Sequence, residues 1–213
     1  NKHEKLLNYY EYYNAFEKEI LSRSEAGDIV VINIRYAYHF SDDWSFEPIE
    51  TFRFFNQRGD VVSRKSKEEH FKEWLSKLKI FTSELSKKNV NVIISTPLPE
   101  FPRGSTLECE GQNTQWFKKL SLKECTYPSD FFTSSSGKYF TLIQGIKEIS
   151  SELSNLYVFD GFSAICESSV CKHFNNEKSL FVDSNHITNY TAKEILGPEM
   201  LKFLRSQNLI KKN

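Results

Sequence analysis

Hydrophobic residues recur at steps of three and four along three segments of the chain, and this spacing predicts amphipathic helices. The first of these helices is expected to end near Gly27. The three stripes consist of Leu6, Tyr9, Tyr13, Phe16 and Ile20, then of Phe71, Trp74, Leu75, Leu78, Thr82 and Leu85, and finally of Tyr139, Leu142, Ile143, Ile146, Ile149 and Leu153.

Local signals indicate where the later helices begin and end. Ser66 and Glu69 have the spacing of a capping box, which predicts the start of the second helix, and Asn89 is expected to end it. A last helix is predicted over residues 189–206, with an interruption at Gly197-Pro198.

Three short apolar runs lie between the helices, and the first two are rich in β-branched residues. They cover residues 28–36 (DIVVINIRY), 90–96 (VNVIIST) and 156–160 (LYVFD). Such runs are typical of strands buried in a parallel sheet. Helices that alternate with parallel strands predict the α/β class, as one three-layer α/β/α domain with a doubly wound sheet over residues 1–213.

The segments between these elements differ in what they predict. Residues 37–64 are polar and aromatic, with a candidate hairpin turn at residues 58–60, and a loop of this length is often functional. Residues 103–135 show little regular pattern. In doubly wound sheets, ligands bind at the carboxyl ends of the strands. Those ends are expected at Arg35-Tyr36, Thr96-Pro97 and Asp160-Gly161.

Composition and charge narrow the class of function. The 213 residues are 39% hydrophobic and 26% charged, which is ordinary for a soluble chain with a core. Lys+Arg and Asp+Glu both count 28, so the net charge is zero and nothing favours binding to nucleic acid. The 18 Phe, 10 Tyr and 3 Trp exceed what a core of this size requires, so some are candidates for lining a groove for flat or sugar-like ligands.

The longest apolar run and the first residue of the chain indicate what kind of polypeptide this is. The longest apolar run, residues 29–34, is far shorter than the roughly 18 residues of a membrane helix. The chain begins at Asn1 without Met, so we expect a processed product or an excised segment of a longer protein.

The four cysteines form two local pairs, Cys109 with Cys125 and Cys166 with Cys171. Each pair lies in polar, turn-rich sequence, and neither has the C-x-x-C spacing of a metal site, so two disulfides are expected. Free buried cysteines are the alternative. Because disulfides persist in oxidising compartments, the pairs predict a location outside the cytoplasm.

The segment 179–192 (SLFVDSNHITNYTA) carries the clearest candidate chemistry. Asp183 and His186 are three residues apart just before a helix, so a carboxylate can orient an imidazole. In serine-dependent acyl transfer, the imidazole accepts the proton of the nucleophile and later returns one, while the carboxylate holds its tautomer. The alternative is that Asp183 caps the turn and His186 is merely exposed.

The same segment resembles the last block of the SGNH hydrolase superfamily, in which D-x-x-H precedes a small or hydroxyl residue and a helix. Three further segments are similar to blocks of the SGNH domains attached to membrane acyltransferases of the acyltransferase-3 family. They are residues 27–36, a strand with an Arg-aromatic end, residues 94–102 followed by Cys109, and residues 156–171, a strand with an aspartate and two close cysteines. The four blocks occur in the order of that family.

This resemblance implies a fold, an activity and a location. The fold is a flavodoxin-like SGNH fold, and the activity is the transfer of O-acyl groups, usually acetyl, to envelope polysaccharide or peptidoglycan, or their removal, by a Ser-His-Asp mechanism without a cofactor. The partners are the polysaccharide acceptor and an acyl-donating membrane domain in the same chain or in a second protein. The chain is then the C-terminal periplasmic or extracellular part of a protein tethered to the membrane through an N-terminal portion.

The sequence departs from the family at the nucleophile. The family places it in a Gly-Asp-Ser-His block after the first strand, but here Gly27-Asp28 precedes Ile29 and Gly59-Asp60 precedes Val61. We expect this block and its strand to precede Asn1. Alternatively the protein lacks them and is a non-catalytic carbohydrate-binding or interaction domain on the same fold, with residues 36–55 as its contact loops.

Other polar residues are candidates for binding substrate. Arg35 and Asn33 alternate onto one face of the first strand, and Arg35 at its carboxyl end suits an acyl carbonyl, a sugar hydroxyl or a structural carboxylate. His39 follows the strand and is placed to line the cleft. His173, with Asp183 and His186, makes too sparse a ligand set to predict a metal site.

Overall fold

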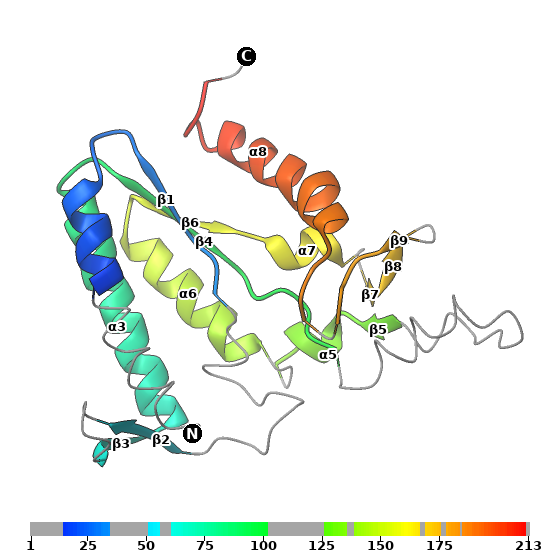
Figure 1. Cartoon of the computed structure of the whole chain (residues 1–213), viewed down its shortest axis with the longest axis horizontal. Helices are drawn as coiled ribbons and strands as arrows, with labels where there is room; N and C mark the ends of the chain where they lie inside the picture. Colours follow the sequence, from blue (N-terminus) through cyan, green and yellow to red (C-terminus); the bar gives the residue numbers. More distant parts are fainter. Residues whose placement is uncertain are drawn as a thin grey trace, which may run out of the picture. The chain divides into compact units, whose positions relative to one another are not determined.

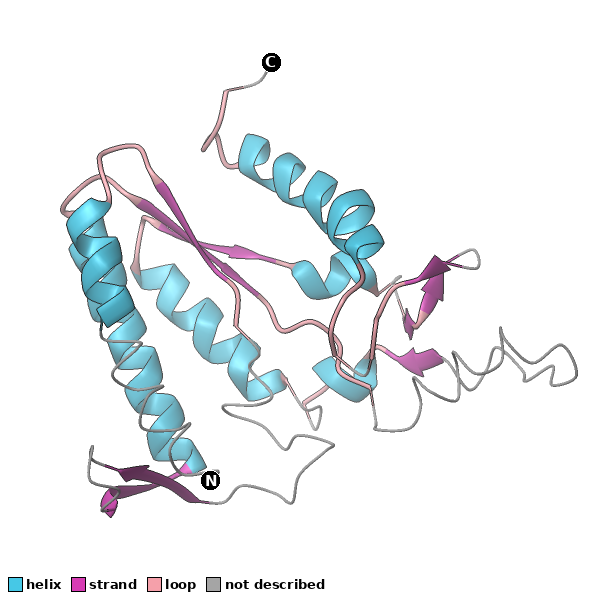
Figure 2. Cartoon of the chain, in the orientation of Figure 1, coloured by secondary structure: helices cyan, strands magenta, loops and turns pink. Residues whose placement is uncertain are grey.

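A computed structural model gives the fold of the chain (Figure 1), and Figure 2 distinguishes its helices from its strands. The described residues are 15–34, 51–55, 61–101, 126–135, 139–166, 169–175, 178–183 and 185–211. The predictions for Arg35, Tyr36, His39, Cys109 and Cys125 lie outside these residues.

A parallel three-stranded sheet lies at the centre of the fold. Its strands are β1 (Ile29–Ile32), β4 (Asn91–Ser95) and β6 (Leu156–Phe159), in the order β1-β4-β6. Strands β1 and β4 pair in parallel, and the amides of Val92 and Thr96 donate to the carbonyls of Asn155 and Phe159, which is the parallel register for β6. The three predicted strands therefore form one sheet, and the α/β class is confirmed, with the parallel sheet and helices of a three-layer α/β/α arrangement.

Burial separates the central strand from the first one. Val92, Ile93 and Ile94 of β4 are fully buried, and each such side chain contributes about 1.5–3 kcal/mol when it leaves water. Strand β1 is an edge of the described sheet, and its Val31 is 53% exposed. The prediction that this strand is buried was therefore wrong for β1, because β1 has one strand partner among the described residues.

The predicted helices are present with similar bounds. The first ends within the described part at residue 23, and helix α3 spans Lys67–Ser86. The capping box of α3 is formed: the Glu69 amide donates to Ser66 Oγ at 3.2 Å, and the Ser66 amide donates to Glu69 Oε2 at 2.7 Å. Asn89 takes a left-handed φ of 57°, which ends the helical stretch before β4. Helix α6 spans Phe140–Glu152.

The last helix has an unusual turn at its centre. It begins at residue 189, continues as the π-helix η2 (Thr191–Leu196), and ends as α8 (Gly197–Ser206). Pro198 has no amide proton and its ring would collide with the carbonyl four residues earlier in a regular α-helix. The π turn widens the helix just before Pro198, with the amide of Gly197 donating to Ala192 O. The predicted interruption is therefore a change of helical type.

Short elements complete the described structure, and the sequence did not predict most of them. Strands β2 (Thr51–Phe55) and β3 (Val61–Ser66) pair antiparallel as a hairpin, as expected for a turn at residues 58–60. The turn residues themselves are not among the described residues. The remaining elements are the paired strands β5 (Thr126–Pro128) with β7 (Val170–Lys172) and β8 (Phe174–Asn175) with β9 (Lys178–Ser179), and the helices α5 (Asp130–Thr133) and α7 (Gly161–Ile165).

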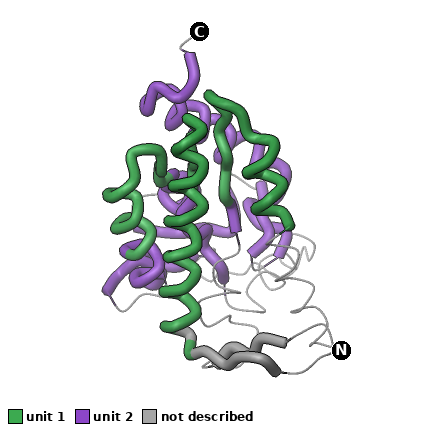
Figure 3. Tube along the Cα trace, turned by 90° about the vertical axis from the view of Figure 1, so that its left-hand side faces the viewer, with its two compact units in different colours: residues 1–32, 48–94, 145–158 green, residues 33–47, 95–144, 159–213 purple. Residues whose placement is uncertain are grey.

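The chain forms two compact units, which Figure 3 shows in green and purple. Unit 1 contains residues 1–32, 48–94 and 145–158, and unit 2 contains residues 33–47, 95–144 and 159–213. Within unit 1, α6 approaches α3 closely at Gly145, where a Cβ atom would lie 2.9 Å from Leu75 Cδ1. Each unit is held together by contacts among its own residues.

Asn155 joins three segments of unit 1. Its side-chain amide donates to Thr82 O at the end of α3, at 3.1 Å, and to Val90 O before β4, at 3.0 Å. The backbone carbonyl of Asn155 accepts the Val92 amide at 2.8 Å, and the residue is 8% exposed. One buried side chain thus donates to two backbone carbonyls, one in α3 and one just before β4.

The core of unit 2 is aromatic and is closed by a disulfide. Cys166 and Cys171 are bonded, as the sequence predicted, and both are buried. They belong to a cluster with Phe101, Phe132, Tyr139, Phe162, Ile165, Leu180 and Phe181. The disulfide therefore closes the loop between α7 and β7 against the aromatic core.

Replacing Asn155 by Ala is expected to lower the free energy of unfolding by roughly 1–3 kcal/mol, because it removes two buried hydrogen bonds to backbone carbonyls. The measurement is urea unfolding at neutral pH. Ser154→Ala is the matched control at an exposed neighbouring position, with an expected change of about 0.5 kcal/mol or less. Equal stability of the two variants would contradict the role assigned to Asn155.

The double variant Cys166→Ala/Cys171→Ala is expected to lose about 2 kcal/mol of stability, the loop-closure contribution for so short a loop. Chemical denaturation with and without reductant measures it: because both proteins keep the predicted Cys109–Cys125 pair, reductant should destabilise the wild type by about 2 kcal/mol more than it destabilises the double variant. A double variant as stable as the oxidised wild type would show that the bond does not stabilise the fold.

Candidate active site

The segment that carries Asp183 and His186 is a tight turn closed by backbone bonds. Phe181 and Ile187 form an antiparallel bridge, and the Val182 amide donates to the His186 carbonyl at 2.6 Å. Phe181 is buried whereas Val182 is exposed, so the turn projects from the aromatic core of unit 2. The two candidate catalytic residues therefore lie on a turn whose base is fixed in that core.

Asp183 is the centre of hydrogen bonding in this turn. Its Oδ1 accepts the amides of Asn185 at 2.9 Å and His186 at 2.7 Å, and its Oδ2 lies 2.6 Å from His186 Nδ1. Partial burial acts to raise the pKa of Asp183, but the two amides and the imidazole outweigh it, so the net pKa is lowered. The carboxylate is thus ionised at neutral pH.

The ionised carboxylate determines the tautomer of His186. A carboxylate has no proton to donate, so the proton in the 2.6 Å contact must be on Nδ1 of the imidazole. In the neutral ring, Nε2 then carries the lone pair and can accept a proton from a nucleophile. The His186 side chain is 69% exposed, so the ring is accessible. The geometry thus leaves an oriented, accessible ring nitrogen that is able to accept a proton.

The other two predicted strand ends have structural contacts. Asp160 caps α7 by accepting the Ser163 amide at 3.0 Å and the Ser163 hydroxyl at 2.7 Å. Thr96 Oγ1 donates to Asp160 Oδ1 at 3.3 Å and accepts the Phe162 amide at 3.1 Å. A Cβ atom on Gly161 would lie 2.7 Å from Ser95 Oγ, so a larger residue there would have to displace the Ser95 side chain. These contacts join the ends of β4 and β6.

The remaining predicted residues do not join the dyad in the described part of the chain. Asn33 lies beyond the end of β1 and is exposed, so its prediction as a strand residue was wrong. His173 is fully buried, with its ring 4.2 Å from that of Phe101 and 5.3 Å from that of Phe181. Among the described residues, no group of three or more His, Cys, Asp or Glu side chains is arranged to hold a metal ion.

Burial determines the charge of His173. Loss of water around the ring lowers the pKa of His173 to about 4, although the negative charge of Asp183 acts in the opposite direction. The ring is therefore neutral at physiological pH. Sequence reasoning did not find this packing role, because nothing in the residues around His173 distinguishes a buried ring from an exposed one.

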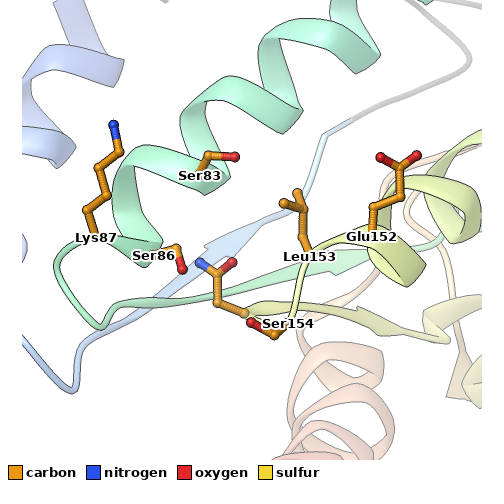
Figure 4. Close-up of a pocket in the computed structure, with 7 residues that line it drawn as sticks. Ser83, Ser86, Lys87, Glu152, Leu153 and Ser154 are labelled. Carbon is orange, nitrogen blue, oxygen red and sulfur yellow. The ribbon is translucent and has the colours of Figure 1, made fainter.

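Two surface pockets lie within single units. Figure 4 shows the one in unit 1, of about 270 Å³, where Ser83 and Ser86 of α3 face Glu152 and Ser154 at the end of α6 and beyond. The second, of about 640 Å³, lies in unit 2 and is lined by α7, η2 and α8, with Phe203 among its residues. Neither includes Asp183 or His186.

Comparison with known proteins gives one match. Residues 3–201 match the model of the family described as "SGNH domain (fused to AT3 domains)". No curated protein and no solved structure matches the chain significantly. In the described residues, no helix is both long and apolar enough to cross a membrane.

The buried ring of His173 predicts a pH dependence of stability. Its folded pKa of about 4 lies below the ordinary value of 6.5, so between these values the unfolded chain binds a proton that the folded chain does not. Stability should therefore fall as the pH drops from about 6.5 to about 4, by at most about 1.4 kcal/mol per pH unit.

Urea unfolding of the wild type and of His173→Asn at several pH values between 4 and 7 measures this term. The variant has no titrating group at this position, so its stability should depend less steeply on pH in this window. Lys178→Ala, at an exposed position, is the control and should keep the wild-type slope. Identical slopes for wild type and His173→Asn would contradict a neutral buried ring.

Proposed function

The chain belongs to the family of SGNH domains fused to AT3 domains, since the family model covers residues 3–201, and on this premise we propose that it catalyses acyl-ester transfer or hydrolysis with His186 as general base. The observation that carries the proposal is the 2.6 Å contact between Asp183 Oδ2 and His186 Nδ1. It leaves Nε2 of an accessible ring to take the proton of a nucleophile. Asp183 orients the ring and stabilises the imidazolium that forms.

The nucleophile in this proposal is a serine outside the 213 residues. None of the described serines bonds to the His186 ring, and the sequence contains no Gly-Asp-Ser. The serine attacks the acyl carbonyl while its proton passes to His186 Nε2, and the bond to the leaving group then breaks as His186 returns that proton to the leaving group, which gives the acyl-enzyme and a neutral ring. His186 next takes a proton from water or from an acceptor hydroxyl, whose oxygen attacks the acyl-enzyme, and it passes this proton to the serine oxygen as the acyl–serine bond breaks.

The fusion that names the family supports the proposed source of the acyl group. An AT3 domain in the same chain is the source of acyl groups, and the acceptor is an envelope polysaccharide or peptidoglycan hydroxyl, with acetyl as the acyl group. The disulfide between Cys166 and Cys171 supports a periplasmic or extracellular location, because such bonds persist under oxidising conditions. The exposed polar turn around His186 suits a hydroxyl-rich acceptor.

The test uses the protein that contains both the SGNH and the AT3 domains, with an activated acetyl ester as the substrate. His186→Ala is expected to lose about a hundred- to ten-thousand-fold in turnover, the usual effect of removing positioned proton transfer. Lys193→Ala, on the exposed side of the last helix, is the control and should keep wild-type turnover. Wild-type turnover by His186→Ala would refute the proposal.

Asp183→Asn separates catalysis from capping. An asparagine can still accept the amides of Asn185 and His186 through its oxygen, so the melting temperature should change little. Its NH₂ group, however, faces His186 Nδ1 and favours the tautomer with the proton on Nε2, so turnover should fall about a hundred-fold or more. If the change lowers stability but not turnover, Asp183 is only a cap.

A second candidate function is non-catalytic binding of carbohydrate, and the absence of Gly-Asp-Ser from the sequence favours it. It makes the opposite forecast: the full protein binds acetylated polysaccharide without cleaving an activated ester, and His186→Ala leaves binding unchanged. Measuring ester cleavage and polysaccharide binding on the same preparations separates the two functions.

A further inference from the structure

Two threonine hydroxyls join the last helix to the strand that enters the Asp183 turn. Thr191, the first residue of η2, is fully buried, and its Oγ1 donates to Leu180 O at 2.7 Å. Thr188 Oγ1 donates to Ser179 O at 2.9 Å and accepts the Thr191 amide at 3.2 Å. The helix start is therefore fixed to two consecutive carbonyls that lie just before the turn.

Each hydroxyl has one proton, and this fixes how the bonds are arranged. Thr188 uses its proton on Ser179 O and Thr191 uses its proton on Leu180 O, so the 3.1 Å contact between the two hydroxyl oxygens holds no proton of its own. Removing the Thr191 hydroxyl therefore takes away a specific donor that Thr188 cannot replace without releasing Ser179.

Leu180 connects the buried part of the site to its exposed part. Its amide donates to His173 O at 2.8 Å, and its carbonyl accepts both the Thr188 amide at 3.0 Å and Thr191 Oγ1 at 2.7 Å. Its side chain is 2% exposed, within the aromatic cluster of unit 2. Asp183 follows three residues later, so the orientation of the Leu180 peptide helps to determine where the Asp183 carboxylate lies.

We propose that Thr191 is a positioning residue for the Asp183–His186 dyad, acting through the Leu180 carbonyl. The inference rests on the proposed function for its catalytic consequence. Asp183 leaves the strand on one side of the turn, and His186 leads through Ile187 and Thr188 into the helix on the other. The Thr191 hydroxyl joins these two sides below the turn, and it thereby holds the carboxylate and the imidazole at hydrogen-bonding distance.

The experiment compares Thr191→Val, which keeps the shape and loses the hydroxyl, with Thr191→Ser, which keeps the hydroxyl. In the protein with both SGNH and AT3 domains, Thr191→Val is expected to lower kcat about ten- to hundred-fold with KM within about two-fold, because small displacements of catalytic groups act on the chemical step. Thr191→Ser should keep turnover within about three-fold of wild type, in line with its retained donor.

A second readout reports the dyad directly, whether or not the protein is active. The ¹⁵N spectrum of histidine-labelled protein shows which ring nitrogen carries the proton, and His186→Gln assigns the signal. Wild type and Thr191→Ser should show a single form protonated on Nδ1, whereas Thr191→Val should show a mixture of tautomers. Thr82→Val is the matched control: it removes a fully buried threonine hydroxyl in unit 1 and should change neither readout.

The outcomes separate this inference from the proposed function. A folded Thr191→Val protein with the wild-type spectrum overturns the inference, and so does a folded Thr191→Ser protein that has lost the Nδ1 form. If the wild type lacks activity, the proposed function fails while the spectra still decide the role of Thr191. If Thr191→Val does not fold, Thr191→Ala replaces it as the hydroxyl-free variant, and unfolding of both, with Thr191→Ser folded and unchanged, shows a role in stability alone and overturns the inference.

Discussion

The candidate site depends on one carboxylate that accepts three N–H groups from its own turn. Asp183 uses Oδ1 for the amides of Asn185 and His186 and Oδ2 for the His186 ring. Capping and catalysis are usually weighed as alternative explanations of an Asp-x-x-His sequence. Here the two oxygens make both sets of contacts at once: Oδ1 caps the turn, and Oδ2 holds the imidazole as the proposed function requires, because the amides that close the turn also bring the imidazole to the second oxygen. The hydrogen bonds that close the turn therefore also orient the His186 imidazole.

The geometry of the Asp183–His186 turn is fixed by the buried contacts at its two ends rather than by contacts of the exposed pair itself. Asp183 and His186 are half or more exposed, so water and rotamer freedom would weaken an isolated pair of this kind. Below them the contacts are buried: Phe181 and Leu180 lie in the aromatic cluster, and Thr191 bonds to the Leu180 carbonyl. The π turn that starts at Thr191 accommodates Pro198 one turn later. These buried contacts hold the foot of the turn rigid. The exposed Asp183–His186 pair can therefore keep one geometry while the His186 ring remains accessible to reactants.

The sequence predicted the parts of the fold that have a period and missed those that do not. Long apolar stripes predicted α3 and α6, and short apolar runs predicted β4 and β6, because burial on one face or on both faces gives a regular pattern of hydrophobic residues. Strands β7, β8 and β9 have two or three residues each, too few for alternation. Strand β7 pairs with the distant β5, and β8 pairs with the neighbouring β9. The dyad was predictable because both residues lie in one turn. The burial of His173 and the Thr191 bond depend on contacts with other segments, such as that of His173 with Phe101, which local sequence does not encode.

The exposure of His186 determines what the rest of an active site must supply. A general base surrounded by water orients the proton transfer but gains little from electrostatics, since water screens the charges that develop. Under the proposed function, the segment that brings the serine must therefore also cover the ring, because it is the covering that excludes water and strengthens the Asp183–His186 interaction when the imidazolium forms. The described residues already provide the part of this chemistry that needs rigidity, namely the tautomer and the direction of the ring. The covering segment must then supply the nucleophile, hydrogen-bond donors for the oxyanion and the exclusion of water. One strand-to-helix turn packed over His186 can provide all three.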